Sequence, residues 1–210
     1  MSGYRQDEEV FLMYSLDRKL KDIALAKSTP SLLLHCCCAP CASYVLEYIS
    51  PFFEITILFF NPNIYPSEEY YKREAEFKKL LSATVYPNSI DMLDCVYNSE
   101  GFETVAMPYW KEPEGGRRCG ECYLLRLEET AKQAKEGGYD YFATTLTVSP
   151  YKDSALLNEI GVKLEGKYGV RYLVSDFKKR DGYKRSIELS KQYGLYRQVY
   201  CGCEPSIVIR

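Results

Sequence analysis

Short apolar runs alternate with longer amphipathic stretches along most of the chain. The apolar runs predict strands at residues 31–35, 55–60, 141–146 and 170–174, with a shorter one at 84–86. The amphipathic stretches predict helices at about 40–49, 68–81, 118–134, 154–168 and 183–193. Such alternation is typical of an α/β domain whose mostly parallel sheet is flanked by helices.

Residues that start and end helices support these boundaries. Ser67 is expected to cap the helix that begins at residue 68, and Asp153 or Ser154 the helix that reaches residue 168. Gly169 then ends that helix, because glycine readily adopts the left-handed conformation that often follows a last turn.

The first residues form an amphipathic segment of their own. Apolar side chains recur in it at near-helical spacing, and Pro30 closes it. They are Val10, Phe11, Tyr14, Leu16, Leu20, Ile23 and Leu25. No repeat, low-complexity segment or linker rich in Gly, Ser or Pro divides the remainder. We therefore predict a helical extension at residues 1–29 that packs on the outside of a single domain at 30–210.

Loops with reactive or polar residues follow four of the predicted strands, at 36–41, 61–66, 147–153 and 175–180. Ligands of open parallel sheets bind outside the carboxyl ends of the strands, where such loops lead into helices. The four loops, together with the start of the helix near residue 118, are therefore predicted to share one crevice.

Composition bears on the cellular setting. The chain has 210 residues, 46% of them hydrophobic, which is enough for one core. It shows neither an apolar signal segment nor an apolar run of about 20 residues, so we expect a cytoplasmic protein without a membrane span. Nine cysteines cannot all pair internally, and in a reducing compartment clustered thiols are metal ligands or redox groups more often than disulfides.

Eight of the nine cysteines gather in three short segments. Cys119 and Cys122 form a C-x-x-C pair, Cys36 to Cys41 contains four thiols, and Cys201-Gly202-Cys203 lies near the C-terminus. A structural zinc ion needs only four ligands, so the surplus indicates two neighbouring metal centres. The adjacency of Cys37 and Cys38 favours the same interpretation, because neighbouring side chains of an extended backbone point in opposite directions.

Two further residues are interpreted as structural. Cys95 stands alone in an amphipathic stretch and is expected to be a small buried hydrophobe. His35 is the only histidine of the chain, and at the end of an apolar strand it is expected to be a core side chain bonded to nearby backbone rather than a metal ligand.

A basic run follows the last predicted strand. The net charge of −2 gives no general case for nucleic-acid binding, which needs a local surplus of positive charge. Such a surplus occurs within eight residues, as Lys178, Lys179, Arg180, Lys184 and Arg185. The run is either a solvated helix entrance or a phosphate-binding surface.

Six motifs occur together in one order. They are L-L-H-C-C-C-A-P-C (33–41), F-F-N-P-N-I-Y-P-S-E-E-Y (59–70), R-R-C-G-E-C-Y-L-L-R-L-E-E-T-A (117–131), T-T-L-T-V-S-P-Y-K (144–152), D-F-K-K-R-D-G-Y-K-R-S (176–186) and L-Y-R-Q-V-Y-C-G-C (195–203). In combination they resemble the QueH-type epoxyqueuosine reductases over residues 32–203. The N-terminal extension lies outside this resemblance.

The resemblance implies a function and a set of cofactors. It implies removal of the epoxide oxygen of epoxyqueuosine at the wobble position of tRNA, without cobalamin, by a Rossmann-like, nucleotide alpha hydrolase-like fold that holds a [4Fe-4S] cluster and a mononuclear iron. Residues 30–210 would then be a metal-binding catalytic domain. Carried over by motif, the ligands are Cys37, Cys38, Cys41, Cys119, Cys122, Cys201 and Cys203, and Cys36 is left out. Of these we assign Cys38, Cys119, Cys122 and Cys203 to the cluster and Cys37, Cys41 and Cys201 to the single iron, a division that the motifs themselves do not give.

The same resemblance implies partners and further site residues. Conversion of an epoxide to an alkene needs two electrons and two protons, so an external electron donor is expected. Asp176, Tyr151 and Lys152 lie in the predicted crevice loops and are the candidate proton donors. The basic run is expected to contact the tRNA anticodon stem-loop, with Tyr65, Tyr151 and Tyr183 as stacking platforms.

Two other classes of protein are alternatives. Iron-sulfur tRNA thiolases need a Gly/Ser-rich loop after the first strand to hold ATP phosphates, and this chain has C-C-C-A-P-C there. A non-catalytic RNA-binding module would carry zinc and would be colourless. A thioredoxin-like reductase fits less well, because the C-x-x-C pair shares its site with further thiols.

Overall fold

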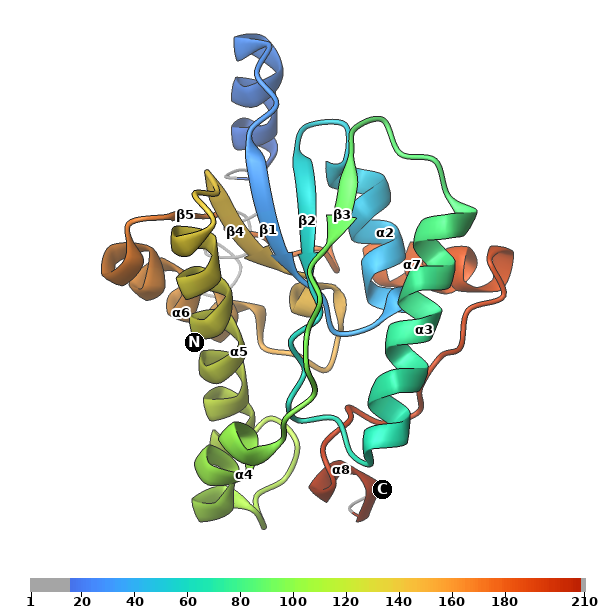
Figure 1. Cartoon of the computed structure of the whole chain (residues 1–210), viewed down its shortest axis with the longest axis vertical. Coiled ribbons are helices and arrows are strands. Elements are labelled where there is room, and N and C mark those ends of the chain that lie inside the picture. The colour runs from blue at the N-terminus through green and yellow to red at the C-terminus, as the bar shows by residue number, and fades with distance from the viewer. Residues whose placement is uncertain (1–15, 209–210) are drawn as a thin grey trace.

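The computed structural model describes residues 16–208, in which a five-stranded, wholly parallel sheet is flanked by helices (Figure 1). The strands are β1 (Ser31–His35), β2 (Glu54–Leu58), β3 (Ile90–Met92), β4 (Tyr141–Thr144) and β5 (Arg171–Tyr172), in the spatial order β3-β2-β1-β4-β5. The predicted α/β class is confirmed. β1 and β4 are neighbours, but the chain continues from β1 toward β2 on one side and from β4 toward β5 on the other. The loops that follow β1 and β4 therefore separate and form the crevice where such sheets bind ligands.

Helices cover both faces of the sheet. In Figure 1, α2 (Ala39–Ile49), α3 (Ser67–Ala83) and α7 (Gly182–Gln192) lie on one side, and α5 (Arg117–Glu136) and α6 (Ser154–Tyr168) on the other. The shorter helices are α4 (Glu100–Ala106), α8 (Pro205–Val208) and the 3-10 turns η1 (Met107–Tyr109) and η2 (Thr145–Val148).

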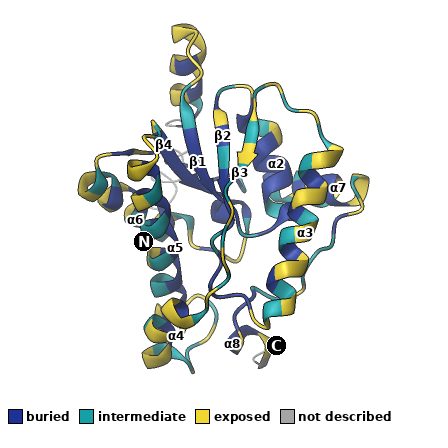
Figure 2. Cartoon of the chain, in the orientation of Figure 1, coloured by how far each residue is buried: buried dark blue, intermediate teal, exposed yellow. Residues whose placement is uncertain are grey.

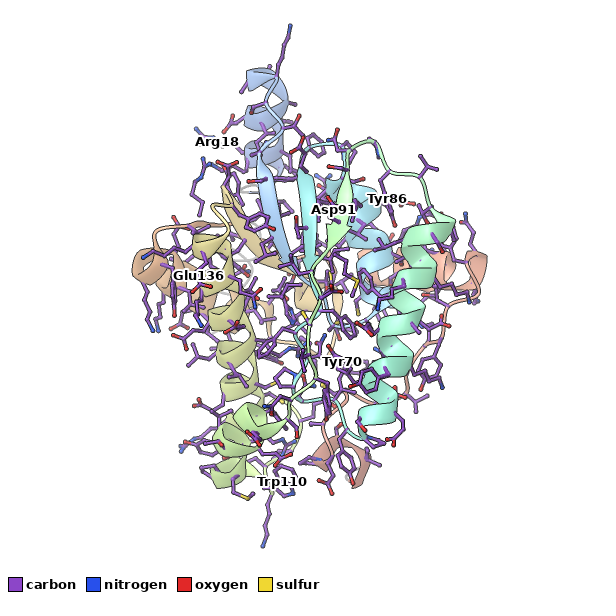
Figure 3. The ribbon with its side chains drawn as sticks, in the orientation of Figure 1. Arg18, Tyr70, Tyr86, Asp91, Trp110 and Glu136 are labelled. Carbon is purple, nitrogen blue, oxygen red and sulfur yellow. The ribbon has the colours of Figure 1, made fainter. Side chains whose placement is uncertain are left out.

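The central strands are buried, because helices cover both faces of the sheet (Figure 2). Their side chains are therefore apolar on both faces. Leu32 and Leu34 belong to the hydrophobic cluster of α2, α3 and α7, whereas Leu33 belongs to the cluster of α5 and α6. Side chains fill the space between these layers (Figure 3). One of them is Tyr70 of α3, whose hydroxyl donates to the Phe59 carbonyl at 3.2 Å, just after β2.

The predicted third strand was wrong. Residues 84–86 form no strand, and β3 lies at Ile90–Met92, where it pairs with β2. The side chain of Val85 is 98% exposed, so the apolar pair at 85–86 does not mark a buried strand. β3 is an edge strand with half-buried residues, and its sequence therefore carries only a weak apolar signal.

Several element ends also differ from prediction. β4 stops at Thr144, whose hydroxyl accepts from the Leu146 amide and starts the η2 turn. Ser67 is the first residue of α3, not its cap, which is Pro66. The predicted cap at Asp153 is confirmed, because its carboxylate accepts from the Leu156 amide at 3.0 Å, and Gly169 ends α6 with φ 74°.

The described part of the N-terminal segment is a helix at residues 16–26. Leu16, Leu20 and Ile23 are buried in the cluster that contains α2 and α7, as expected for a helix packed on the outside. Val10, Phe11 and Tyr14 lie outside the described residues. Between residues 16 and 208, no helix combines the length and the apolar character that crossing a bilayer requires.

Close packing of α7 against α2 depends on Gly182. A Cβ at this position would lie 1.9 Å from the Phe177 carbonyl oxygen and 2.3 Å from the Tyr44 ring. Gly182→Ala is therefore expected to lower the free energy of unfolding by about 1–3 kcal/mol. Gly166→Ala is the matched control, because nothing lies within 4 Å of its added methyl in α6, and it is expected to raise stability by about 0.5–1 kcal/mol.

Urea unfolding of the two variants checks this packing argument. The free energy of unfolding is expected to fall for Gly182→Ala and to rise for Gly166→Ala. An unchanged urea midpoint for Gly182→Ala would show that α7 can move away from α2 at little cost.

Candidate active site

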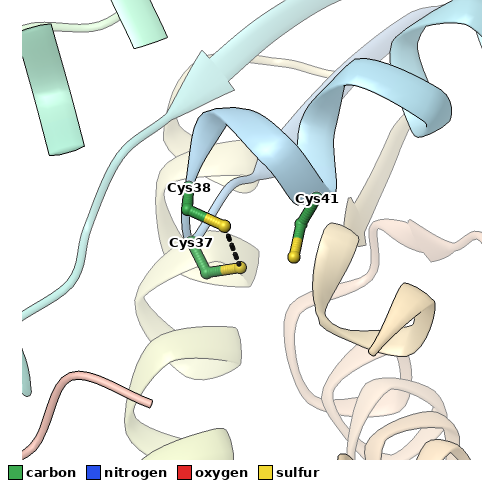
Figure 4. A group of neighbouring side chains, drawn as sticks. All are labelled: Cys37, Cys38 and Cys41. Atoms are coloured by element: carbon green, nitrogen blue, oxygen red, sulfur yellow. Dashed lines mark hydrogen bonds between the residues drawn. The ribbon is translucent and has the colours of Figure 1, made fainter. Parts of the chain in front are cut away.

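Three thiols meet where β1 turns into α2. Cys37 is at a bend and Cys38 is the extended N-cap of α2, so the backbone changes direction between them. The Cys37 and Cys38 sulfurs are 3.7 Å apart, and both lie within 4.8 Å of the Cys41 sulfur (Figure 4). The expectation that adjacent cysteines diverge was wrong, since it assumed a continuous strand.

These three thiols share their protons unequally. Hydrogen bonds from Cys37 and Cys41 lower the pKa of Cys38 well below its usual value, although burial opposes this. The hydrogen bonds to Cys37 and Cys38 raise the pKa of Cys41, and the bond to Cys38 raises the pKa of Cys37. The geometry therefore favours one thiolate held by two thiols, a group ready to exchange its protons for a metal ion.

A second group of four cysteines comes from distant parts of the chain. Cys119 and Cys122 lie in the first turns of α5, and together with Cys201 and Cys203 they line one small cavity. The Gly115 amide donates to the Cys119 sulfur at 3.2 Å. A hydrogen bond from Cys203 and the nearby positive charge of Lys152 lower the pKa of Cys201 well below its usual value.

The C-terminal thiols are held in place by backbone contacts. Arg73 of α3 donates to the Cys201 carbonyl at 3.1 Å, and the Tyr65 amide donates to the Gly202 carbonyl at 2.8 Å. Gly202 has φ 129°, and a Cβ there would lie 3.1–3.2 Å from Ile64, Arg73 and Asn63. The glycine between the two cysteines thus permits the chain to pass close beside the loop after β2.

A larger cavity of about 400 Å³ opens beside both cysteine groups. Cys37, Cys41 and Cys201 line it, and Arg126, Lys152 and Cys201 line both this cavity and the small one. Most of the remaining walls are polar or aromatic, and three residues are aliphatic. The polar and aromatic ones are Arg73, Glu114, Ser149, Tyr151, Tyr183, Arg197, Gln198 and Tyr200, and the aliphatic ones are Pro40, Leu146 and Val199. The cavity therefore combines thiols with groups suited to a polar, planar ligand.

The predicted crevice is only partly as expected. The loops at 36–41 and 147–153 and the helix α5 contribute to the large cavity, whereas residues 61–66, Tyr65 among them, and residues 175–180 do not line it. Sequence reasoning missed the segment 197–200, whose place follows from how the C-terminal chain returns to the sheet. The motif around Cys201 and Cys203 was the only signal for it.

Two of the three candidate proton donors line the large cavity. Lys152 is 8% exposed, and its Nζ lies 3.0 Å from the Cys201 sulfur and 2.8 Å from a Glu114 oxygen. Burial works to lower the pKa of Lys152, but Cys201 and Glu114 raise it above its usual value. Tyr151 lines the same cavity and is exposed. Asp176 lies elsewhere, in a small pocket beside the N-terminal helix.

Internal ion pairs occupy much of the basic run. Arg180 pairs with Asp17, and Lys178 lies 3.3 Å from Asp176. Arg185 binds Glu47 at 2.8 Å and Glu188 at 3.3 Å. Carboxylates of the protein therefore already balance these three side chains, and their surplus of positive charge is smaller than the sequence indicates.

A buried network joins the strand ends to α5. His35 is fully buried, its Nδ1 lies 2.9 Å from the Thr144 hydroxyl, and Arg126 donates from Nε to its Nε2 at 3.1 Å. Burial, followed by the charge of Arg126, lowers the pKa of His35 to about 3, so the ring is neutral. Nε2 also lies 3.1 Å from the backbone carbonyl oxygen of Phe60. His35 is thus a core side chain, as predicted.

The two remaining cysteines lie apart from the seven. Cys36 is fully buried in the core, and burial raises its pKa well above the usual value. Cys95 is partly buried and packs against the cluster of α5 and α6. All nine cysteines are free thiols in the structure.

The sequence profile described as "Epoxyqueuosine reductase QueH" matches residues 32–208. This range contains all seven cysteines of the two groups. The chain belongs to the QueH family. An epoxyqueuosine reductase QueH of Streptococcus pyogenes serotype M1 is 43% identical over 176 residues, which are 83% of this chain and 69% of the relative.

Other QueH relatives support the assignment. The epoxyqueuosine reductase QueH of Staphylococcus epidermidis is 43% identical over 83% of this chain and 75% of its own length. The Thermotoga maritima protein of the same name is 34% identical over 86% of this chain and 92% of its own length. As a QueH protein the chain is an oxidoreductase, and the described thiols, cavity and Lys152 lie inside the matched region.

Proposed function

We propose that this QueH protein reductively removes the epoxide oxygen of epoxyqueuosine at the wobble position of tRNA and leaves queuosine, without cobalamin. The observation that carries the proposal is the convergence of two groups of thiols, seven in all, and Lys152 beside a small cavity and an adjoining polar, aromatic one. The names of the relatives supply the substrate. Unbridged thiols suit a reducing compartment, so we place the protein in the cytoplasm.

The donor set fits iron and sulfide. Cys119, Cys122, Cys201 and Cys203 form a group of four around one cavity, the number that a [4Fe-4S] cluster requires, and all but the half-buried Cys201 are buried. Cys37, Cys38 and Cys41 form a group of three within 4.8 Å, which suits a mononuclear iron with an open coordination position. This grouping differs at Cys38 and Cys201 from the division assigned on the sequence, so we propose the arrangement that follows sulfur proximity in the group of three and the shared cavity in the group of four.

The reaction balances with two electrons and two protons. Both carbon–oxygen bonds of the epoxide break, the alkene forms, and the oxygen leaves as water. When bound, the cofactors supply electrons one at a time and a Lewis acid for the oxygen. An external reductant must reduce the cofactors again after each turnover, because each turnover consumes two electrons.

Protein side chains handle the protons and the substrate. Lys152 Nζ is in the wall of the large cavity, and its raised pKa keeps it protonated at neutral pH. An oxygen leaving carbon is a far stronger base than an amine, so it can take this proton. Glu114 is within 2.8 Å of Nζ and can return a proton to it. Tyr151 and Tyr183 offer flat faces for the modified base.

The decisive experiment is turnover with a defined substrate. Anaerobically purified, iron-loaded protein is incubated with epoxyqueuosine-containing tRNA and a low-potential reductant, and the digested nucleosides are identified by mass spectrometry. Conversion to queuosine is expected only with reductant and metal. A colourless protein filled with zinc that binds tRNA without converting it would support the RNA-binding module instead.

The tRNA surface is proposed to lie around the cavity mouth and the start of α7. Arg180 and Arg185 are balanced by carboxylates, whereas no ion pair is found for Lys184 among the residues that the structure describes. Lys184→Glu is therefore expected to weaken tRNA binding several-fold and to reduce the slope of log affinity against log salt by about 1.

Filter-binding titrations at several salt concentrations check this prediction, with Lys163→Glu on the exposed face of α6 as the control. Equal losses from both substitutions would show that net charge, and not the surface at α7, governs tRNA binding.

A further inference from the structure

Arg126 is a buried cation between the two cysteine groups. Its side chain is 2% exposed and lines both cavities. Its Nη1 lies 3.8 Å from the Cys122 sulfur, its Nη2 donates to the Asn61 side-chain oxygen at 2.6 Å, and its Nε donates to His35. Every partner other than sulfur is neutral, so only sulfur can balance the charge of the guanidinium.

Two other buried cations of the site have carboxylate partners. Arg73 is 2% exposed and binds Glu69 at 2.7 Å, and Lys152 binds Glu114 at 2.8 Å. Within residues 16–208 no carboxylate lies within ion-pair distance of Arg126. A buried charge without a counter-charge costs several kcal/mol, so proteins rarely keep one unless something else compensates it.

Arg118 repeats the pattern in the same small cavity. It is 1% exposed, and it donates through Nη1 to the carbonyls of Trp110 and Glu112. Its Nε and Nη2 have no hydrogen-bond partner among the described residues, although both atoms are buried. Two guanidinium groups therefore line the cavity formed by Cys119, Cys122, Cys201 and Cys203, and neither has a carboxylate partner in the described part of the chain.

We propose that Arg126, with Arg118 as a second cation, is the built-in counter-ion of the thiolate-bound cofactor and sets its reduction potential. This inference rests on the proposed iron-sulfur site. Thiolate ligation makes such a group net negative, and one more electron makes it more negative. A fixed positive charge in a low-dielectric surrounding favours the reduced form and raises the potential.

The charge also couples cofactor binding to stability. In the metal-free protein Arg126 is poorly compensated, whereas in the loaded protein it neutralises bound thiolates. Arg126→Met keeps most of the side-chain length and removes the charge. Without metal, this variant is expected to melt at the same temperature as the parent or at a higher one. When both proteins are loaded with metal, it is expected to melt at a lower temperature than the parent. If the arginine were purely structural, its replacement would lower the melting temperature both with and without metal.

The test uses full-length loaded protein and three variants. Arg126→Met is expected to shift the reduction equilibrium of the cluster at least tenfold, a fall of about 59 mV for a one-electron couple, measured by anaerobic redox titration with electron paramagnetic resonance. Arg126→Lys, which keeps the charge, is expected to shift it less. Lys132→Met removes an exposed charge from the same helix and is expected to change neither the potential nor either melting temperature.

Each outcome decides the proposal. A potential for Arg126→Met equal to that of Lys132→Met overturns it, as does loss of the cluster from both Arg126 variants, because shape and not charge would then matter. Loss from the Met variant alone supports it. If Arg126→Met does not fold, Arg118→Met must show the same fall in potential.

Failure of the proposed function is recognised separately, in the parent protein, by zinc in place of iron and sulfide. In that case the melting temperatures of the parent and of Arg126→Met are compared in the zinc-loaded and in the metal-free protein, and this comparison still measures the effect of the charge. Reversal of the order of parent and Arg126→Met on metal loading supports the counter-ion role, and an unchanged order overturns it.

Discussion

Replacing Cys122 by serine is expected to remove the sulfide-containing cluster and to reduce epoxyqueuosine turnover to background. Cys122 is buried in the four-thiol cavity, and a serine hydroxyl cannot replace a thiolate that binds a soft metal centre. The loss of one ligand leaves the group incomplete, and the three-thiol group at the start of α2 is expected to keep its iron. Iron and sulfide analysis of anaerobically purified protein measures both losses.

Cys38→Ser and Cys95→Ser complete this series. Sulfur proximity places Cys38 with Cys37 and Cys41, so Cys38→Ser should lose about one iron and no sulfide. Loss of sulfide would instead support the division assigned on the sequence, in which Cys38 binds the cluster. Cys95 lies apart from both groups, and Cys95→Ser is the control that should keep full iron, sulfide and activity.

Replacing Lys152 by methionine is expected to lower turnover by about 10²–10⁴-fold, the usual contribution of a positioned proton donor. Lys152 is the one candidate that combines three properties: it lines the cavity, it is buried, and it contacts both Cys201 and Glu114. Single-turnover rates with prereduced protein isolate this step from electron supply.

Two companion variants separate proton transfer from electrostatics. Lys152→Arg keeps the positive charge but cannot give up a proton, so it should be nearly as slow as Lys152→Met. Recovery of most of the rate by arginine would indicate a purely electrostatic role. Tyr151→Phe removes only a phenol at the cavity rim and should cost less than about tenfold; a larger loss would transfer the donor role to Tyr151.

The elements that the sequence predicted well are those with a strong apolar signal. β1 was predicted with both ends as observed, and α2, α5, α6 and α7 to within a few residues, because a helix or strand buried on a core face must carry periodic apolar positions. β3 was misplaced and α4 was not predicted. Both lie toward the edge of the fold, where partners from elsewhere in the chain decide whether a short segment is ordered.

The site shows the same division. The motifs alone mark the seven cysteines, Lys152 and Tyr151, because thiols and their spacing are visible along the chain. The pairing of Lys152 with Glu114 and the place of Arg126 between the cysteine groups could not be predicted, since each depends on segments far apart in sequence. The net positive charge of the basic run could not be predicted either, because Asp17 and Glu47, which pair with Arg180 and Arg185, come from other helices.

By itself the sequence determined the α/β class, the cysteine set and the resemblance to the QueH reductases, because apolar periodicity and residue spacing are local properties of a chain. Only the tertiary structure decided which sulfurs lie together, which candidate proton donor faces them, and which cations lack a carboxylate. Those properties are distances between strand ends, α5 and the C-terminal segment, and they arise when the parallel sheet brings its carboxyl ends to one edge.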